Sequence, residues 1–275
     1  MRLMLVMLMM LLLSRPALVM DAASEACALF VSSVMPGLLP YMTLSQMLAS
    51  RTQRMHPAAL ILLGWGGGSP TGGRLMALCP QLQGKQQVRL AVCCATMSPM
   101  FLQGTLGRWL GSSGAGWCIL TAVLSGGALT GMLAGIIPRS KHTVTAVFPE
   151  TLTLGQAVEQ TARTLLMVCG TMAVLRVMAA LSCEITERFL PWLTLPLTTL
   201  LEVTTGCASI ASLPLPITLR TALMAGATGF GGMALVLQNR AVWPTGLMSL
   251  PEQILWQAVH GGLSFLIALG IMQMI

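Results

Sequence analysis

Residues 109–137 read WLGSSGAGWCILTAVLSGGALTGMLAGII and contain no Asp, Glu, Lys or Arg. A helix needs about 20 mainly apolar residues to cross the roughly 30 Å hydrocarbon core of a bilayer, so this stretch is long enough. Backbone groups in lipid must be paired within the segment, and the residues do not alternate between polar and apolar as barrel strands do. We therefore predict a membrane helix here. Four further stretches lack these charged residues, namely 26–50, 90–107, 221–239 and 253–275.

The composition of the whole chain agrees with this prediction. Hydrophobic residues make up 55% of the 275 residues and charged residues only 8%, whereas soluble domains carry about 25% charged residues. The net charge of +7 comes from basic residues scattered singly between apolar stretches, which is typical of membrane-protein loops and argues against nucleic-acid binding. The eight cysteines form no CxxC pair and the three histidines are far apart, so we expect no metal site. We see no pairing of a nucleophile with a base, so we expect no catalytic residues and no enzyme.

Two other apolar stretches, 56–82 and 189–219, are interrupted at their centres by GWGGGSPTGG (64–73) and EVTTG (202–206). Each has two limbs of about a dozen residues, and at about 1.5 Å per residue such a limb reaches only about halfway through the bilayer. We expect two re-entrant hairpins, in preference to two kinked crossing helices. The remaining apolar stretches predict seven crossings, over about residues 3–20, 28–50, 88–108, 116–137, 161–182, 221–239 and 253–273.

Each expected hairpin is followed by a helix that is itself broken, over 88–108 and 221–239. Gly- or Pro-interrupted segments at matching places of two halves point to the midplane site of a transporter. Three crossings separate the hairpins, and this odd number makes the repeat inverted. The sequence thus predicts an all-α, polytopic membrane helical bundle, an inverted repeat with two re-entrant hairpins and two broken helices. Its expected parts are an N-terminal membrane helix and interfacial segment (1–35), a first repeat (36–137), a loop (138–160) and a second repeat (161–275).

The distribution of basic residues predicts the orientation. The side of the membrane that holds most of them should be cytoplasmic. The N-terminus then lies in the cytoplasm, the first hairpin opens to the cytoplasm and the second opens to the far side. The basic residues assigned to the cytoplasmic side are Arg2, Arg51, Arg54, Lys85, Arg89, Arg139, Lys141 and Arg240.

Glu202 stands alone between two stretches without Asp, Glu, Lys or Arg, namely 189–201 and 203–219. A carboxylate at membrane depth costs roughly 3 kcal/mol on insertion scales and indicates a functional site. The alternative is a Glu at the level of the lipid headgroups. Because a carboxylate repels an anion, we expect Glu202 to order the hairpin tip or to bind a coupling cation.

The first interruption offers backbone N–H groups and a helix N-terminus, which favour an anion. Arg74 follows it, and could balance an anionic ligand or extend to the interface. Gln103 and Gln238 could hydrogen-bond a substrate or a neighbouring helix. The full set of expected substrate-binding residues is Gly68, Ser69, Pro70, Thr71, Gly72, Arg74, Ser98, Pro99, Gln103, Glu202, Thr204, Thr205, Gly206, Gly231, Gly232 and Gln238.

Four motifs resemble, in the same order, those of the YlbJ-type sporulation integral membrane proteins, also called SpoVV, a gate-domain group similar to concentrative nucleoside transporters. GGSPTGGR (67–74) resembles G-G-Y-P-S-G-A-K, and SPMFLQGTLG (98–107) resembles S-P-L-F-I-I-G-T-V-G. LEVTTG (201–206) resembles L-E-M-T-N-G, and FGGMALVLQ (230–238) resembles F-G-G-L-x-V-H-x-Q. The resemblance covers residue 36 to the C-terminus. Ser69, Thr205 and Val236 stand where the family has Tyr, Asn and His.

The resemblance implies a role in endospore formation, the movement of dipicolinic acid from the mother cell across the outer forespore membrane. We accordingly expect a multi-pass cell-membrane protein that acts as a secondary transporter of a small organic anion. Its expected partners are the lipid bilayer, the anionic substrate and further copies of itself, with H⁺ or Na⁺ as the coupling ion and no other cofactor. The alternatives are a nucleoside-type transporter of the same architecture and a sporulation membrane factor that transports nothing.

Overall fold

The computed structural model describes residues 2–52, 55–77, 82, 84–136 and 151–274. These residues form helices and connecting segments and contain no strand, so the prediction of an all-α bundle is confirmed for this part of the chain. The helices are α1 (Arg2–Ser14), α2 (Pro16–Leu29), α3 (Met35–Arg51), α4 (Pro57–Gly67), α5 (Thr71–Ala77), α6 (Lys85–Cys93), α7 (Leu106–Trp109), α8 (Ser113–Ala134), α9 (Leu154–Phe189), α10 (Thr194–Leu201), α11 (Val203–Ala211), α12 (Ile217–Phe230), α13 (Gly232–Val242) and α14 (Leu250–Met274), together with the π-helical turns η1 (Phe30–Val34) and η2 (Met100–Thr105) and the 3₁₀ turn η3 (Pro191–Leu193).

Among the described residues, five helical stretches are long and apolar enough to cross a membrane. They are Pro16–Arg51, Ser113–Ala134, Leu154–Phe189, Ile217–Val242 and Leu250–Met274. Two of the seven expected crossings differ from this set. The stretch 3–20 is divided at Arg15, because Pro16 has no N–H and its ring collides with the preceding turn, so α1 stops and a new helix begins. The stretch 88–108 is divided as well, since α6 ends at Cys93 and helical structure resumes only beyond Ser98.

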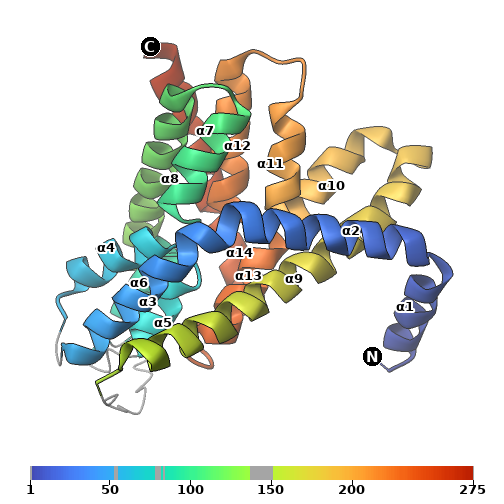
Figure 1. Ribbon diagram of the computed structural model, residues 1–275. Helices are drawn as coiled ribbons and strands as arrows, with labels where there is room; N and C mark the ends of the chain where they lie inside the picture. The colour runs from blue at the N-terminus through green and yellow to red at the C-terminus, as the bar shows by residue number, and fades with distance from the viewer. Residues whose placement is uncertain (1, 53–54, 78–81, 83, 137–150, 275) are drawn as a thin grey trace.

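Three helices form the packed centre of the bundle. α14 lies against both α8 and α12, and α8 also contacts α6 and α12 (Figure 1). Glycines allow this close approach: a Cβ at Gly126 of α8 would lie 2.6 Å from the Ser264 hydroxyl of α14, and one at Gly229 of α12 would lie 2.5 Å from the same atom. Small residues at helix contacts are characteristic of membrane bundles, where backbones approach closely without a hydrophobic driving force.

The two 36-residue helices form an antiparallel pair that runs obliquely to these three (Figure 1). Phe30, Leu38 and Met42 on the first pack against Leu165, Val168 and Met172 on α9. At about 1.5 Å per residue each helix is about 54 Å long, more than the roughly 30 Å of a hydrocarbon core. Long hydrophobic helices accommodate such an excess by tilting, and their oblique course agrees with that.

Two pairs of short helices carry the interruptions that the sequence singles out. α4 packs against α5, with the break at residues 68–70, and α10 packs against α11, with the break at Glu202. Each pair follows a long helix and precedes a broken helix, which is α6–η2–α7 in the first half and α12–α13 in the second. A long helix then closes each half, α8 or α14, so the order of elements is the same in both halves.

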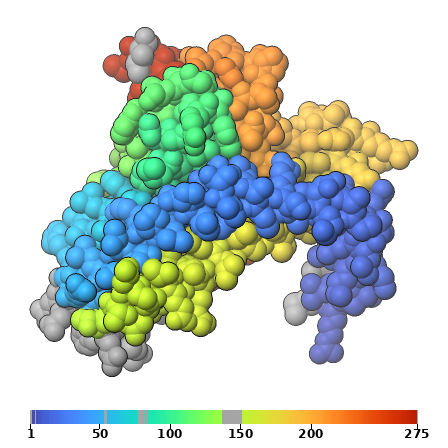
Figure 2. Space-filling view, viewed as in Figure 1, coloured from blue at the N-terminus to red at the C-terminus, as the bar shows by residue number. Residues whose placement is uncertain are grey.

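The sequence predicts a loop over 138–160, but this loop ends earlier than expected. α9 already begins at Leu154, where Thr153 and Gln156 form a capping box. Residues 137–150, with Arg139 and Lys141, lie outside the described residues, and so does Arg54. At the other end of the chain, most of α1 stands clear of the rest of the molecule (Figure 2), although Leu12 packs against the cluster of Ala22, Val177 and Leu181. Its apolar side chains are exposed around the helix, including Leu3, Met7 and Met10.

Candidate functional site

A small cavity of about 40 Å³ lies where both short helix pairs and both broken helices meet. Its polar lining comes from the two short-helix breaks and from the segments that follow them. Its apolar lining comes from the two long oblique helices, from η2, α11 and α13, and from Met97. The lining residues are Val34, Leu38, Ser69, Met97, Ser98, Phe101, Val168, Met172, Glu202, Val203, Thr204, Gly231, Ala234, Leu235 and Gln238.

The break between α4 and α5, which we call the first tip (residues 68–70), is fixed against the broken first helix. Gly68 has φ +63°, and a Cβ there would lie 2.5 Å from the backbone nitrogen of Ser98, so glycine is required on both counts. The backbone N–H of Ser69 donates to the carbonyl oxygen of Thr96 over 2.6 Å. The hydroxyl of Ser69 donates to the side-chain oxygen of Asn239 on α13. The first tip therefore joins the two halves of the chain.

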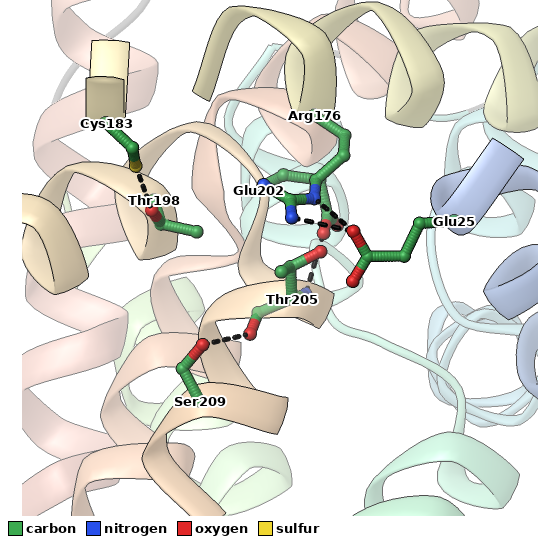
Figure 3. Close-up of polar contacts among 7 residues, drawn as sticks. All are labelled: Glu25, Arg176, Cys183, Thr198, Glu202, Thr205 and Ser209. Carbon is green, nitrogen blue, oxygen red and sulfur yellow. Dashed lines mark hydrogen bonds and ion pairs between the residues drawn. The ribbon is translucent and has the colours of Figure 1, made fainter. Parts of the chain in front are cut away.

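The break between α10 and α11, the second tip, is the single residue Glu202. Its side chain is 1% exposed and caps the N-terminus of α11. One carboxylate oxygen accepts from the Thr204 N–H over 3.0 Å and the other from the Thr205 N–H over 2.7 Å. Figure 3 shows Thr205 beside this carboxylate. A helix N-terminus favours a negative charge, and these two bonds replace part of the hydration that burial removes.

The second tip lies against the broken second helix, as the first tip lies against the first. Gly231 and Gly232 have φ +79° and +68° and form the junction between α12 and α13. A Cβ at Gly232 would lie 3.2 Å from the carbonyl oxygen of Leu200 and 3.4 Å from the nitrogen of Val203. The N-terminus of α13 thus starts at the second tip, and its first N–H groups have no partner within the helix itself.

The cavity is mostly apolar with a few polar groups that converge. Its apolar lining includes Val34, Leu38, Val168 and Met172, which pack in one cluster, and Phe101. Ser69, Ser98, Thr204 and Gln238 supply hydroxyl and amide groups, and Glu202 is the charged residue of the described lining. Such a combination binds a small organic molecule through its apolar body and orients it through a few hydrogen bonds.

The structure brings six of the sixteen expected site residues to the cavity wall: Ser69, Ser98, Glu202, Thr204, Gly231 and Gln238. Eight others lie in the tips and breaks or within four residues of them without lining the cavity: Gly68, Pro70, Thr71, Gly72, Pro99, Thr205, Gly206 and Gly232. Two are elsewhere. Arg74 lies half-buried on α5, and its Nε has no hydrogen-bond partner among the described residues. Gln103 lines a separate surface groove with Ser32, Gly37 and Arg108.

Sequence reasoning missed three kinds of residue. It did not identify Asn239, which accepts a hydrogen bond from Ser69 of the first tip. A second amide directly after Gln238 in an apolar helix was a usable signal. It also passed over Arg176, which lies inside the expected crossing 161–182 and pairs with Glu25 of α2 over 2.7 Å (Figure 3). The apolar walls Val168 and Met172 carried no signal, because they resemble any lipid-facing residues.

The described residues contain no group of three or more His, Cys, Asp or Glu side chains that could hold a metal ion. Comparisons with known protein families, with curated proteins and with solved structures find no match to this chain. Its function must therefore be argued from the cavity.

Proposed function

We propose that the chain is a secondary transporter whose substrate binds in the central cavity. The observation that carries the proposal is the position of that cavity, between two interrupted short-helix pairs and two broken helices. Irregular backbone at membrane depth is tolerated only inside protein or beside water. Transporters use such discontinuous helices to build a substrate site near the bilayer midplane. A membrane scaffold has no need of this arrangement.

The matching order of elements supports an inverted repeat with two re-entrant hairpins as the framework of this transporter. α4 has 11 residues and α10 has 8, and at about 1.5 Å per residue neither approaches the roughly 30 Å needed for a crossing. Each pair would therefore enter and leave on the same side of the membrane. Rocking of one repeat against the other would open the cavity first to one side and then to the other.

A small organic anion is the first substrate to test, and dipicolinate is the specific choice. The N-terminus of α13 lies at the lining residue Gly231, and its partial positive charge favours anionic groups, whereas the Glu202 carboxylate already caps the N-terminus of α11. The resemblance to the YlbJ-type sporulation proteins supplies the compound itself and, with it, the outer forespore membrane as the location and a cytoplasmic N-terminus.

A nucleoside-type transporter is the second candidate, and one observation favours it. Glu202 is the charged residue of the described cavity lining, and Arg74 does not line the cavity. A dianion would meet a carboxylate without a compensating cation, whereas a neutral, hydrogen-bonding substrate would not. The hydroxyl and amide groups of Ser69, Thr204 and Gln238 suit such a substrate equally well.

Uptake into proteoliposomes decides between these substrates. Purified protein should take up labelled dipicolinate with saturation, and unlabelled dipicolinate should compete. A variant that fills the cavity, Ala234→Leu, should lose uptake, because Ala234 is a buried lining residue. Ala128→Leu on α8, outside the cavity, is the matched control. Saturable nucleoside uptake without competition by dipicolinate would establish the second candidate, and uptake of neither compound by wild-type protein would count against transport of both classes.

A further inference from the structure

A second, smaller cavity of about 10 Å³, room for about one water molecule, lies apart from the central one and shares no lining residue with it. Its polar wall is a single face of α14, formed by Gln253, Gln257 and His260. These positions are four and three residues apart, so the three side chains stack along one side of the helix. The rest of the lining is Val92, Ala95, Trp243, Met248 and Trp256.

The polar atoms of this face are buried and lack protein partners. Gln253, Gln257 and His260 are 1%, 3% and 1% exposed. The Oε1 atom of Gln253, both side-chain polar atoms of Gln257 and Nδ1 of His260 have no hydrogen-bond partner among the described residues. Leaving one such group unpaired costs about 1–3 kcal/mol. Several unpaired groups around one cavity therefore indicate that it holds an ordered water molecule.

The hydrogen bond on the other side of His260 determines where the ring can accept a proton. Its Nε2 lies 2.8 Å from the carbonyl oxygen of Val123 on α8. A carbonyl can only accept, so Nε2 carries the hydrogen, and a neutral imidazole then has its lone pair on Nδ1. The unpaired atom of the ring is thus a proton acceptor beside a cavity that suits water.

We propose that His260 binds the proton that drives transport, an inference that rests on the transport function proposed above. A hydronium ion in the cavity gives its proton to Nδ1: an O–H bond breaks, an N–H bond forms and a water molecule remains. The ring gains one positive charge and keeps its bond from Nε2–H to the Val123 carbonyl. The free side-chain oxygens of Gln253 and Gln257 accept from the new N–H group directly or through water.

The same face of α14 is connected to the central cavity through α13. The side-chain amide of Gln253 donates to the Val236 carbonyl over 3.1 Å. α13 also carries Gln238, which lines the central cavity, and Asn239, which accepts from Ser69 of the first tip. A charge that appears on His260 reorients its amide neighbours and thereby α13, which holds both the substrate wall and the first tip.

Among the described residues, His260 forms no ion pair with a carboxylate. Arg240 of α13 donates to the Met248 carbonyl at the cavity wall over 3.3 Å, and Arg220 of α12 donates to the Ala211 carbonyl. On α14 itself, Glu252 accepts from Trp256. The other ionisable groups on the packed helices are Lys85, Arg89, Cys93 and Cys94 of α6 and Cys118 of α8. The amide oxygens and water must therefore stabilise the charged ring.

The test compares uphill transport with exchange in proteoliposomes that carry labelled dipicolinate or, if it is the substrate found, labelled nucleoside. A pH gradient should make wild-type protein accumulate substrate. His260→Gln, which preserves a donor to the Val123 carbonyl, should lose accumulation completely yet still exchange labelled for unlabelled substrate. His56→Gln, at the exposed start of α4, is the matched control and should accumulate normally. Accumulation by His260→Gln at the wild-type level, or wild-type accumulation that follows Na⁺ and ignores pH, would overturn the proposal.

A titration that needs no transport separates this inference from the transport function. In a variant with His56→Gln and His142→Gln, His260 is the sole histidine, and its ring nitrogens can be labelled and followed by NMR. The Nδ1 signal should shift with pH, and the shift should vanish when His260→Gln is added. A ring that stays neutral throughout the range in which the protein remains folded contradicts proton binding. If wild-type protein neither accumulates nor exchanges substrate while the ring titrates, transport fails and the proton site stands.

Discussion

Glu202 can remain buried because two backbone N–H groups receive its two oxygens. The sequence identifies this residue as an isolated acid at membrane depth, which follows from the cost of burying charge. What the sequence could not show is that the carboxylate caps the helix that begins directly after it. The geometry favours its expected role in ordering the second tip, since both oxygens already accept from α11.

The first prediction concerns this carboxylate. Glu202→Gln has one acceptor oxygen, so its NH₂ group must face a backbone N–H, and we expect the free energy of unfolding to fall by about 1–3 kcal/mol. Substrate uptake should be mostly lost at normal membrane insertion. Thermal unfolding in detergent and proteoliposome uptake measure the two effects. Glu187→Gln, exposed at the end of α9, is the control and should change neither. Full uptake by Glu202→Gln would show that the charge is dispensable.

A second prediction concerns Gly68 at the first tip. Gly68→Ala places a Cβ 2.5 Å from the Ser98 nitrogen and 2.9 Å from Met97 backbone carbon, in a residue with φ +63°. Because backbone cannot move aside as a flexible side chain can, we expect a lower melting temperature and loss of uptake. Gly170→Ala on α9 meets no atom within 4 Å and should keep or slightly raise the melting temperature, since Ala is favoured over Gly in helices. Equal melting temperatures for the two variants would refute the close contact at the tip.

At the scale of helices, the interruptions were predictable and the helix lengths were not. Gly and Pro act locally, so the breaks at residues 68–70, at 94–98 just before Pro99 and at 231 follow from the sequence. The sequence predicts a crossing that begins near residue 28, after an interfacial segment, yet the helix continues from Pro16 to Arg51. Arg176 of α9 compensates Glu25, and such a tertiary contact cannot be seen in a single sequence.

This ion pair gives the third prediction. Arg176 reaches Glu25 through two nitrogens, at 2.7 and 3.1 Å, and its side chain is only 18% exposed. Arg176→Leu should lower the melting temperature because it leaves Glu25, whose side chain is 54% exposed, without its partner. Exchanging the charges, with Glu25→Arg and Arg176→Glu together, should recover part of the loss, as a double-mutant cycle would show. Arg163→Leu, which breaks the exposed pair with Glu159 on the same helix, should change the melting temperature little.

At the scale of the whole molecule, the sequence could not assemble the cavity. Val168 and Met172 line it, whereas Leu166 and Val174 of the same helix are 73% and 62% exposed on the outside. In a soluble protein, polar residues would mark the outward face, but in lipid both faces of a helix are apolar. Only the tertiary arrangement distinguishes a wall of the cavity from a surface that meets the acyl chains.

The last prediction tests the membrane topology of the two short helix pairs. Single cysteines are placed on a cysteine-free background at exposed positions on the two sides of each tip: Ala58 and Lys85 for the first pair, Arg188 and Ser212 for the second. If both pairs re-enter, the two positions of a pair react with an impermeant thiol reagent from the same face of the membrane. If the repeat is inverted, the first pair reacts from one face and the second from the other.

The reason for this expectation is the length of the helices. α4 and α5 have 11 and 7 residues, so at about 1.5 Å per residue each reaches at most about 17 Å into a core of roughly 30 Å. Joined end to end, α4 and α5 could just cross. However, α4 packs against α5, and α10 packs against α11, so the chain must turn back between the two helices of each pair. Labelling of Ala58→Cys and Lys85→Cys from opposite faces would make the first pair a crossing helix. The two halves would then no longer be related by inversion, and alternating access by rocking of two repeats would lose its basis.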